Sequence, residues 1–134
     1  MKHLLPLLLV CFVGCSNGVP THSVTGTVRV NGKPAPHGTV MFRPVEVSKE
    51  DGKRHVARAS IEKDGTYTLT TFETGDGAVA GTHTVAVLMP PYSASETGPQ
   101  AKPLIPAKLN TPNTSGLEYE VKPGSNEIDI ELNW

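Results

Sequence analysis

Hydrophobic and polar positions alternate along a series of short segments of this chain. In residues 24–30, Val24, Val28 and Val30 share one side of an extended chain, and polar residues occupy most of the other side. A period of two is typical of a β-strand with one buried face. Seven segments favour strands in this way, in residues 24–30, 39–43, 56–61, 66–71, 83–89, 117–121 and 128–132. No segment shows the period of an amphipathic helix.

The connections between these segments favour tight turns. Asn31-Gly32 follows the first segment at once, and Asp64-Gly65 precedes the fourth. Both dipeptides tolerate the positive φ angles that short turns between strands require. The fifth segment, residues 83–89, is more continuously apolar than the others, which predicts a central position in a sheet. The pattern as a whole predicts an all-β domain, a seven-stranded antiparallel Greek-key β-sandwich.

The same alternation predicts which side chains face the core. Val40 and Phe42 share the inner side of one strand, and Tyr67 and Leu69 share the inner side of another. In the last segment three apolar residues alternate with the acidic residues Glu127, Asp129 and Glu131. We expect these carboxylates on a solvated face, where they resist edge-to-edge association of strands.

Residues 90–116 interrupt the pattern. Six of these residues are proline, which excludes a central strand or a helix interior. A connection of this length in a compact domain is usually functional or disordered. We expect Ile105 and Leu109 to hold its second half against the domain, and Tyr92 to be an exposed aromatic residue within it.

The N-terminus has the pattern of an export signal. Lys2 precedes an apolar run that ends before Gly14 and Cys15, as in a secretory signal peptide. The run is shorter than the roughly 20 residues that a membrane-spanning helix needs. Phe12-Val13-Gly14-Cys15 resembles a bacterial lipobox, which implies cleavage after Gly14 and diacylation of Cys15. An ordinary secretory signal and an uncleaved anchor are the alternatives.

Processing at this position defines the predicted organisation of the chain. Residues 1–14 are the lipoprotein signal peptide, residues 15–21 a lipidated tether, and residues 22–134 the β-sandwich domain. Cys11 leaves with the signal, so the mature chain keeps only Cys15 and forms no disulfide. Exported small domains are often stabilised by disulfides, and this one must rely on its hydrophobic core. The formal net charge of −1 and the absence of a basic patch argue against a nucleic-acid partner.

Several motifs resemble a known family. The valines of residues 24–30 followed by Gly32-Lys33-Pro34 look like the opening of carboxypeptidase-regulatory-like domains, and Asp64-Gly65-x-Tyr67-x-Leu69 is similar to their next hairpin. Further motifs are similar to small exported lipoproteins of planctomycete-type bacteria: Gly75-Asp76-Gly77-Ala78, Gly81-x-His83-x-Val85-x-Val87, Ile105-Pro106-Ala107-Lys108 and Thr114-Ser115-Gly116-Leu117. The resemblance implies a transthyretin-like sandwich. It implies no catalytic residues, because that group has no catalytic motif to transfer.

Candidate catalytic and metal-binding residues are few. Four histidines remain after processing, none has the spacing of metal ligands, and we expect all four to be solvated at the surface: His22, His37, His55 and His83. Three Asp-Gly pairs lack the ligand density of a calcium loop and are interpreted as turns: Asp51-Gly52, Asp64-Gly65 and Asp76-Gly77. Ser115 before Gly116 is also interpreted as turn chemistry. We therefore predict no catalytic, cofactor-binding or metal-binding residues.

These observations favour a non-enzymatic protein. The leading prediction is an exported, lipid-anchored scaffold or interaction module of the cell envelope, with Cys15 as its contact to membrane lipid and an unknown envelope protein or glycan as partner. Ser16 follows Cys15 where an inner-membrane lipoprotein would carry Asp, which favours the outer membrane. The alternative is a small-molecule or carbohydrate-binding module that uses the loop of residues 90–116, with Tyr92 and Trp134 as ligand contacts. An enzyme is the third class considered.

Overall fold

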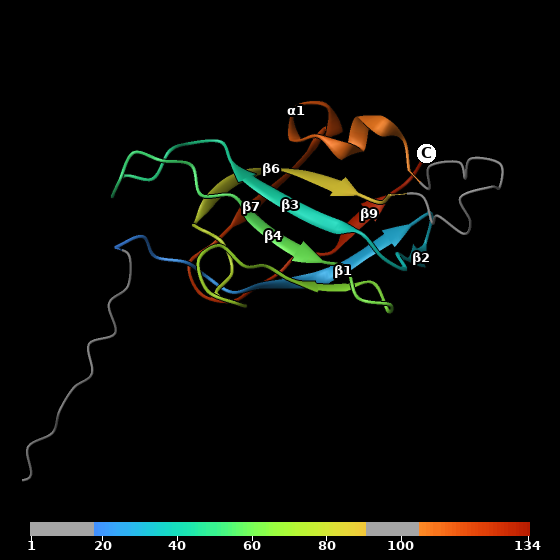
Figure 1. Cartoon of the computed structure of the whole chain (residues 1–134), viewed down its shortest axis with the longest axis horizontal. Coiled ribbons are helices and arrows are strands. Elements are labelled where there is room, and N and C mark those ends of the chain that lie inside the picture. The colour runs from blue at the N-terminus through green and yellow to red at the C-terminus, as the bar shows by residue number, and fades with distance from the viewer. Residues whose placement is uncertain (1–17, 91–104) are drawn as a thin grey trace, which may run out of the picture.

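The computed structural model describes residues 18–90 and 105–134, whose strands form two β-sheets (Figure 1). The first sheet contains five strands, β1 (Val24–Val30), β2 (Lys33–Pro34), β5 (Thr66–Thr68), β8 (Asn126–Glu127) and β9 (Ile130–Leu132). The second sheet has the order β4 (Ala57–Ser60), β3 (Thr39–Pro44), β6 (Gly81–Leu88) and β7 (Leu117–Val121). Each of the seven predicted segments overlaps one of these strands, and β2 and β8 are additional two-residue strands. The all-β prediction is confirmed.

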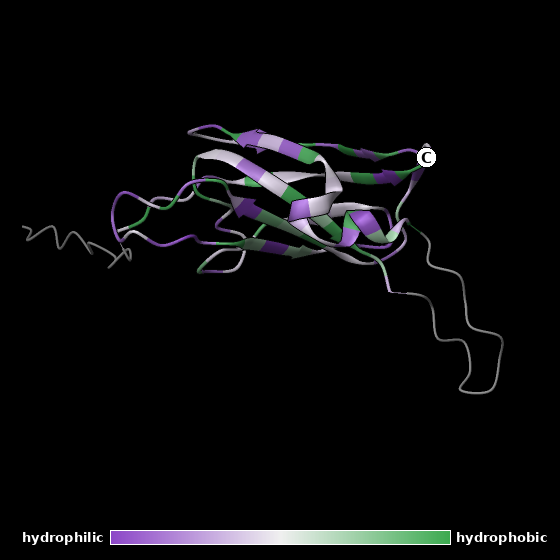
Figure 2. Ribbon diagram, turned by 90° about the horizontal axis from the view of Figure 1, so that it is seen from above, coloured by the Kyte–Doolittle hydropathy of each residue, from purple (hydrophilic) through white to green (hydrophobic). Residues whose placement is uncertain are grey.

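Burial follows the predicted period of two. Alternate residues of β3 and β4 are buried, including Val40 and Phe42 on the inner face. The hydropathy colouring of Figure 2 alternates along the strands in the same way. Strand β6 lies between β3 and β7, which confirms the central position predicted for residues 83–89.

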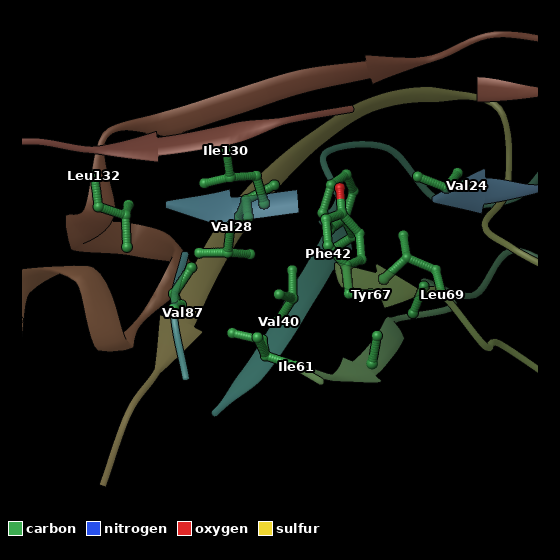
Figure 3. Close-up of a cluster of buried hydrophobic side chains, with 14 of the residues drawn as sticks. Val24, Val28, Val40, Phe42, Ile61, Tyr67, Leu69, Val87, Ile130 and Leu132 are labelled. Atoms are coloured by element: carbon green, nitrogen blue, oxygen red, sulfur yellow. The ribbon is translucent and has the colours of Figure 1, made fainter. Parts of the chain in front are cut away.

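The hydrophobic core lies between the two sheets. Figure 3 shows valines of both sheets, including Val28 and Val40, directed into the same space. Phe42 is fully buried and its ring lies 6.3 Å from that of Tyr67, centroid to centroid. Burial of this kind supplies the main stabilising free energy of a domain.

The C-terminal strands depart from the prediction. Strands β8 and β9 pair with β1 in parallel, so an entirely antiparallel arrangement is wrong for this part of the sheet. The predicted strand of residues 128–132 is shortened to β9 because two groups ahead of it have other partners. The carbonyl of Ile128 accepts a hydrogen bond from the Tyr67 hydroxyl, and the carboxylate of Asp129 accepts one from the backbone N–H of Thr27.

The second half of the proline-rich connection is more regular than expected. It forms a 3₁₀ helix, η1 (Ala107–Asn110), and a one-turn α-helix, α1 (Pro112–Ser115). Proline is compatible with the first turn of a helix, and Gly116 ends α1 in the left-handed conformation. Ile105 and Leu109 are buried, as predicted, and hold this segment against the core.

The first described residue and the C-terminus lie at opposite ends of the molecule. The described chain starts at Gly18, close to the loop between β3 and β4, and the C-terminus lies at the opposite end (Figure 1). Within residues 18–90 and 105–134, no helix is long and apolar enough to cross a membrane.

Candidate functional site

The predicted site residues fall into two groups. Gly14, Cys15 and Tyr92 lie outside the described residues, so the structure does not place them. Trp134 is described and is 56% exposed. Its backbone N–H donates a hydrogen bond of 3.3 Å to the side-chain oxygen of Asn31, which ties the last residue to the turn after β1.

A small hollow of about 150 Å³ lies beside Trp134. Polar groups of Lys108, Glu131 and Asn133 line it together with the indole ring. The remaining lining comes from the segment of η1 and α1 and from β7 and β9: Pro106, Leu109, Ser115, Leu117 and Leu132. An exposed aromatic ring next to charged and amide side chains offers an apolar face together with polar groups.

Ser115 has a structural role at the rim of this hollow. Its hydroxyl donates a hydrogen bond to the carbonyl of Val85 at 2.5 Å and accepts one from the backbone N–H of Leu117 at 3.1 Å. Both bonds join α1 to β6 and β7. This arrangement agrees with the prediction of turn chemistry, although the side chain is buried.

A larger groove of about 560 Å³ lies at the opposite end, where the described chain begins. Val19 and His22 form one wall, and residues 44–50 of the loop after β3 form another. Residues 79–82, at the start of β6, and Glu118 of β7 complete it. Sequence reasoning treated residues 46–55 only as an exposed loop and missed this groove. Its signal was the alternation of Val45 and Val47 with polar residues directly after Pro44.

His83 is fully buried, which contradicts the predicted surface position. It lies within β6, on the same face as Val85 and Val87, and its Nε2 is 2.8 Å from the carbonyl oxygen of Val79. Because a carbonyl only accepts, Nε2 carries the proton. Burial lowers the pKa of His83, and the neighbouring backbone groups of Val79 and Phe42 offset part of this effect.

The Asp-Gly pairs stabilise turns. The carboxylate of Asp76 accepts hydrogen bonds from the backbone N–H groups of Thr71, Phe72 and Glu73 at 2.7, 3.0 and 3.0 Å. Partial burial raises the pKa of Asp76, but these bonds outweigh it and the pKa lies below its usual value. Asp64 accepts hydrogen bonds from the backbone and hydroxyl of Thr66.

No group of three or more His, Cys, Asp or Glu side chains in the described part of the chain is arranged to hold a metal ion. Glu131 lies 3.9 Å from Arg29 across the parallel pair of β9 and β1, with both side chains about half exposed. Such exposed pairs contribute little to stability. Glu127, Asp129 and Glu131 are all exposed, which confirms the solvated face predicted for them.

Comparison with known proteins returns no relative: no family model, no curated protein and no solved structure matches this chain.

Proposed function

We propose that this chain is an exported, lipid-anchored protein of the cell envelope that works as a non-enzymatic scaffold or interaction module. The observation that supports this best is the short distance between anchor and body. Val19, four residues after Cys15, is already buried against the body, and the described residues contain no cysteine. Acylation of Cys15 would anchor the domain close to a membrane surface.

The anchor is sufficient for stable attachment in physical terms. Each acyl CH₂ buried in a membrane contributes about 0.8 kcal/mol, and two chains hold a protein where a single one gives only reversible binding. The body does not depend on the anchor, because its core is formed by residues of both sheets. At the level of topology we propose the seven-stranded, transthyretin-like Greek key, with β2 and β8 as short additions, and an outer-membrane location.

The chemistry of the described side chains favours a non-enzymatic role. Asp76 is held by three backbone N–H groups, Ser115 bonds two backbone groups, and the Nε2 of His83 bonds the Val79 carbonyl inside the core. Groups committed in this way stabilise turns and strands. The partners proposed are membrane lipid through Cys15 and an envelope protein or glycan.

The test is substitution of the anchor residue in cells that process lipoproteins. Cys15→Ser is expected to abolish incorporation of labelled fatty acid and to release the protein from the membrane fraction. Cys11→Ser is the matched control, because Cys11 lies in the segment that cleavage removes, and it should leave both properties unchanged. Retention of C15S in membranes to the wild-type level would overturn the proposal.

A second candidate function is binding of a small molecule or glycan at the opposite end. It is favoured by the exposure of Trp134 beside the hollow that Lys108, Glu131 and Asn133 line. Trp134 is the single tryptophan of the chain, so its fluorescence reports on this hollow. Titration with envelope oligosaccharides should change the emission of the wild-type protein, and calorimetry should show loss of binding in Trp134→Ala. An unchanged spectrum at saturating sugar would exclude this candidate.

A further inference from the structure

Exposed hydrophobic side chains gather at one end of the molecule. The described residues include four large hydrophobic side chains that are exposed, and three of them are Val45, Val47 and Phe72, at 45%, 50% and 36%. Val45 and Val47 follow β3 directly, and Phe72 follows β5. The fourth, Trp134, lies at the opposite end.

The two valines lie beside the start of the body, and Phe72 lies beside the loop that carries them. Residue 22 pairs with residue 78 in an isolated antiparallel bridge, which brings the loop that contains Phe72 next to the N-terminal residues. The ring of Phe72 lies 4.9 Å from that of His55, at the far end of the loop between β3 and β4. Val19 and Pro20 line the same groove as Val45 and Val47.

The loop that carries the two valines is held in a defined shape. The guanidinium of Arg54 donates two hydrogen bonds to the carbonyl of Val45, at 3.2 and 3.1 Å. The backbone N–H of Ser48 donates to the carbonyl of Lys53 at 2.8 Å, which closes the loop. The valines are thus presented by an ordered element that extends beyond the strands (Figure 1).

The length of the tether determines what this end faces. Three residue steps separate Cys15 from Gly18, and fully extended chain covers at most about 3.6 Å per step. If Cys15 is acylated, as proposed above, Gly18 cannot be further than about 11 Å from the acylated residue. The end that contains Gly18 then stays close to the lipid surface, and Trp134 lies at the other end of the molecule (Figure 1).

The charges of the loop between β3 and β4 indicate how this end of the molecule would contact a membrane. Residues 45–55 contain three basic and three acidic side chains that balance each other: Lys49, Lys53, Arg54, Glu46, Glu50 and Asp51. An attraction to anionic headgroups would require an excess of basic residues. Apolar insertion at the interface is the remaining mode, and the strength of such binding grows with the apolar area that is buried in the membrane.

We propose that Val45, Val47 and Phe72 form a membrane-contacting surface that inserts into the interfacial region of the bilayer and fixes the orientation of the lipidated domain. This inference rests on the proposed lipid anchor. It adds a second contact to lipid, and it places the hollow beside Trp134 on the side that faces away from the membrane.

The test uses the full lipidated protein on vesicles of phosphatidylcholine that carries bromine in its acyl chains, a quencher of tryptophan. One variant combines Trp134→Phe with Val47→Trp, and the wild-type protein with its native Trp134 is the matched control. The emission of V47W is expected to shift to the blue and to be strongly quenched, equally at low and at high salt. Trp134 should show neither effect.

Each outcome decides the proposal. Quenching of V47W to no greater extent than Trp134 would overturn the membrane-contacting surface. A blue shift without quenching, accompanied by cross-linking between copies, would assign these residues to a dimer and also overturn it. Failure of the wild-type protein to float with the vesicles would instead overturn the lipid anchor, so the two failures are distinguishable.

A second measurement avoids dependence on a tryptophan variant. Amide hydrogen exchange in residues 45–55 and 71–75 of the wild-type lipidated protein should slow several-fold on vesicles relative to the C15S protein in solution. Residues 31–38 at the other end should exchange equally in both states. Equal exchange at both ends would contradict the proposal.

Discussion

The hydroxyl of Tyr67 donates a hydrogen bond of 2.5 Å to the backbone carbonyl of Ile128, on the other side of strand β1. Tyr67 lies on β5 directly opposite Gly26 of β1, and Ile128 lies between β8 and β9 on the far side of β1. The bond crosses β1 at Gly26, the one residue of that strand without a side chain. A Cβ atom at this position would lie 1.9 Å from the Ile128 oxygen. Gly26 therefore makes the junction of three strands possible.

Gly26→Ala should be among the most destabilising substitutions in the first sheet. The added methyl group would overlap the Ile128 carbonyl and force Tyr67 away from it. We expect a loss of about 2–4 kcal/mol, since overpacking is combined with a lost buried hydrogen bond. Urea unfolding followed by circular dichroism measures this loss. Thr25→Ala is the control, because Thr25 is the exposed neighbour of Gly26. If Gly26→Ala lowers the unfolding free energy no more than Thr25→Ala does, the contact between Gly26 and the Ile128 carbonyl is not tight.

Tyr67→Phe isolates the hydrogen bond from the packing. The ring remains in place, but the carbonyl of Ile128 loses a partner, which should cost about 1–2 kcal/mol of unfolding free energy. Burial raises the pKa of Tyr67, so the hydroxyl remains a donor through the alkaline range. Tyr119→Phe is the matched control, since the half-buried Tyr119 contributes its ring to a stack with Phe42. Equal losses in the two variants would contradict a special role for the bond.

Local patterns predicted the strands but not their partners. The period of two located Val40 and Phe42 correctly because each strand has one buried face. It could not reveal that β9 runs parallel to β1, because strand direction depends on the path of the whole chain. The shortening of β9 depends on a bond from Tyr67, which is 61 residues from Ile128.

The same alternation could have predicted that His83 is buried. His83 alternates in phase with Val85 and Val87, and this phase predicts an inward side chain. The residue type suggested a solvated surface instead, and the environment of β6 between β3 and β7 prevailed. For the groove at the start of the body, the sequence offers only the alternation of Val45 and Val47, because Val19 and Val47 meet there through the tertiary fold.

Phe42→Ala should create a cavity at the centre of the core. Phe42 is fully buried, and its ring contacts those of Tyr67, His83 and Tyr119. Truncation of a buried phenylalanine costs about 3–5 kcal/mol. Phe72→Ala, at the surface, is the matched control and should change the unfolding free energy by less than about 1 kcal/mol. Thermal and urea unfolding of the two variants compare them, and similar midpoints would mean that Phe42 is not part of the core.

Asp76→Ala should destabilise the loop between β5 and β6. Three backbone N–H groups lose their acceptor. We expect a loss of about 1.5–3 kcal/mol of unfolding free energy, the value of a single hydrogen bond to a charged group, because water can replace part of the lost bonds in this partly exposed loop. Because the pKa of Asp76 is lower in the folded protein than in the unfolded chain, its stabilisation is complete above about pH 5 and is lost as the pH falls below about 4. Unfolding at pH 7 and pH 3 measures this difference. Glu73→Ala in the same loop is the control, and an equal effect of both variants would contradict the role of Asp76.

His83 should make the protein less stable in mild acid. Its pKa is lowered by burial in the folded state, whereas in the unfolded chain it lies near about 6.5. Below that pH the unfolded chain binds a proton that the folded protein does not, so unfolding becomes easier as the pH falls. The free energy of unfolding, measured from pH 8 to pH 5, should decline more steeply in the wild-type protein than in His83→Gln, whose amide can still donate to the Val79 carbonyl. The other histidines are common to both proteins, so their contributions cancel in the difference. Parallel curves would show that the His83 ring accepts a proton as readily in the core as in water.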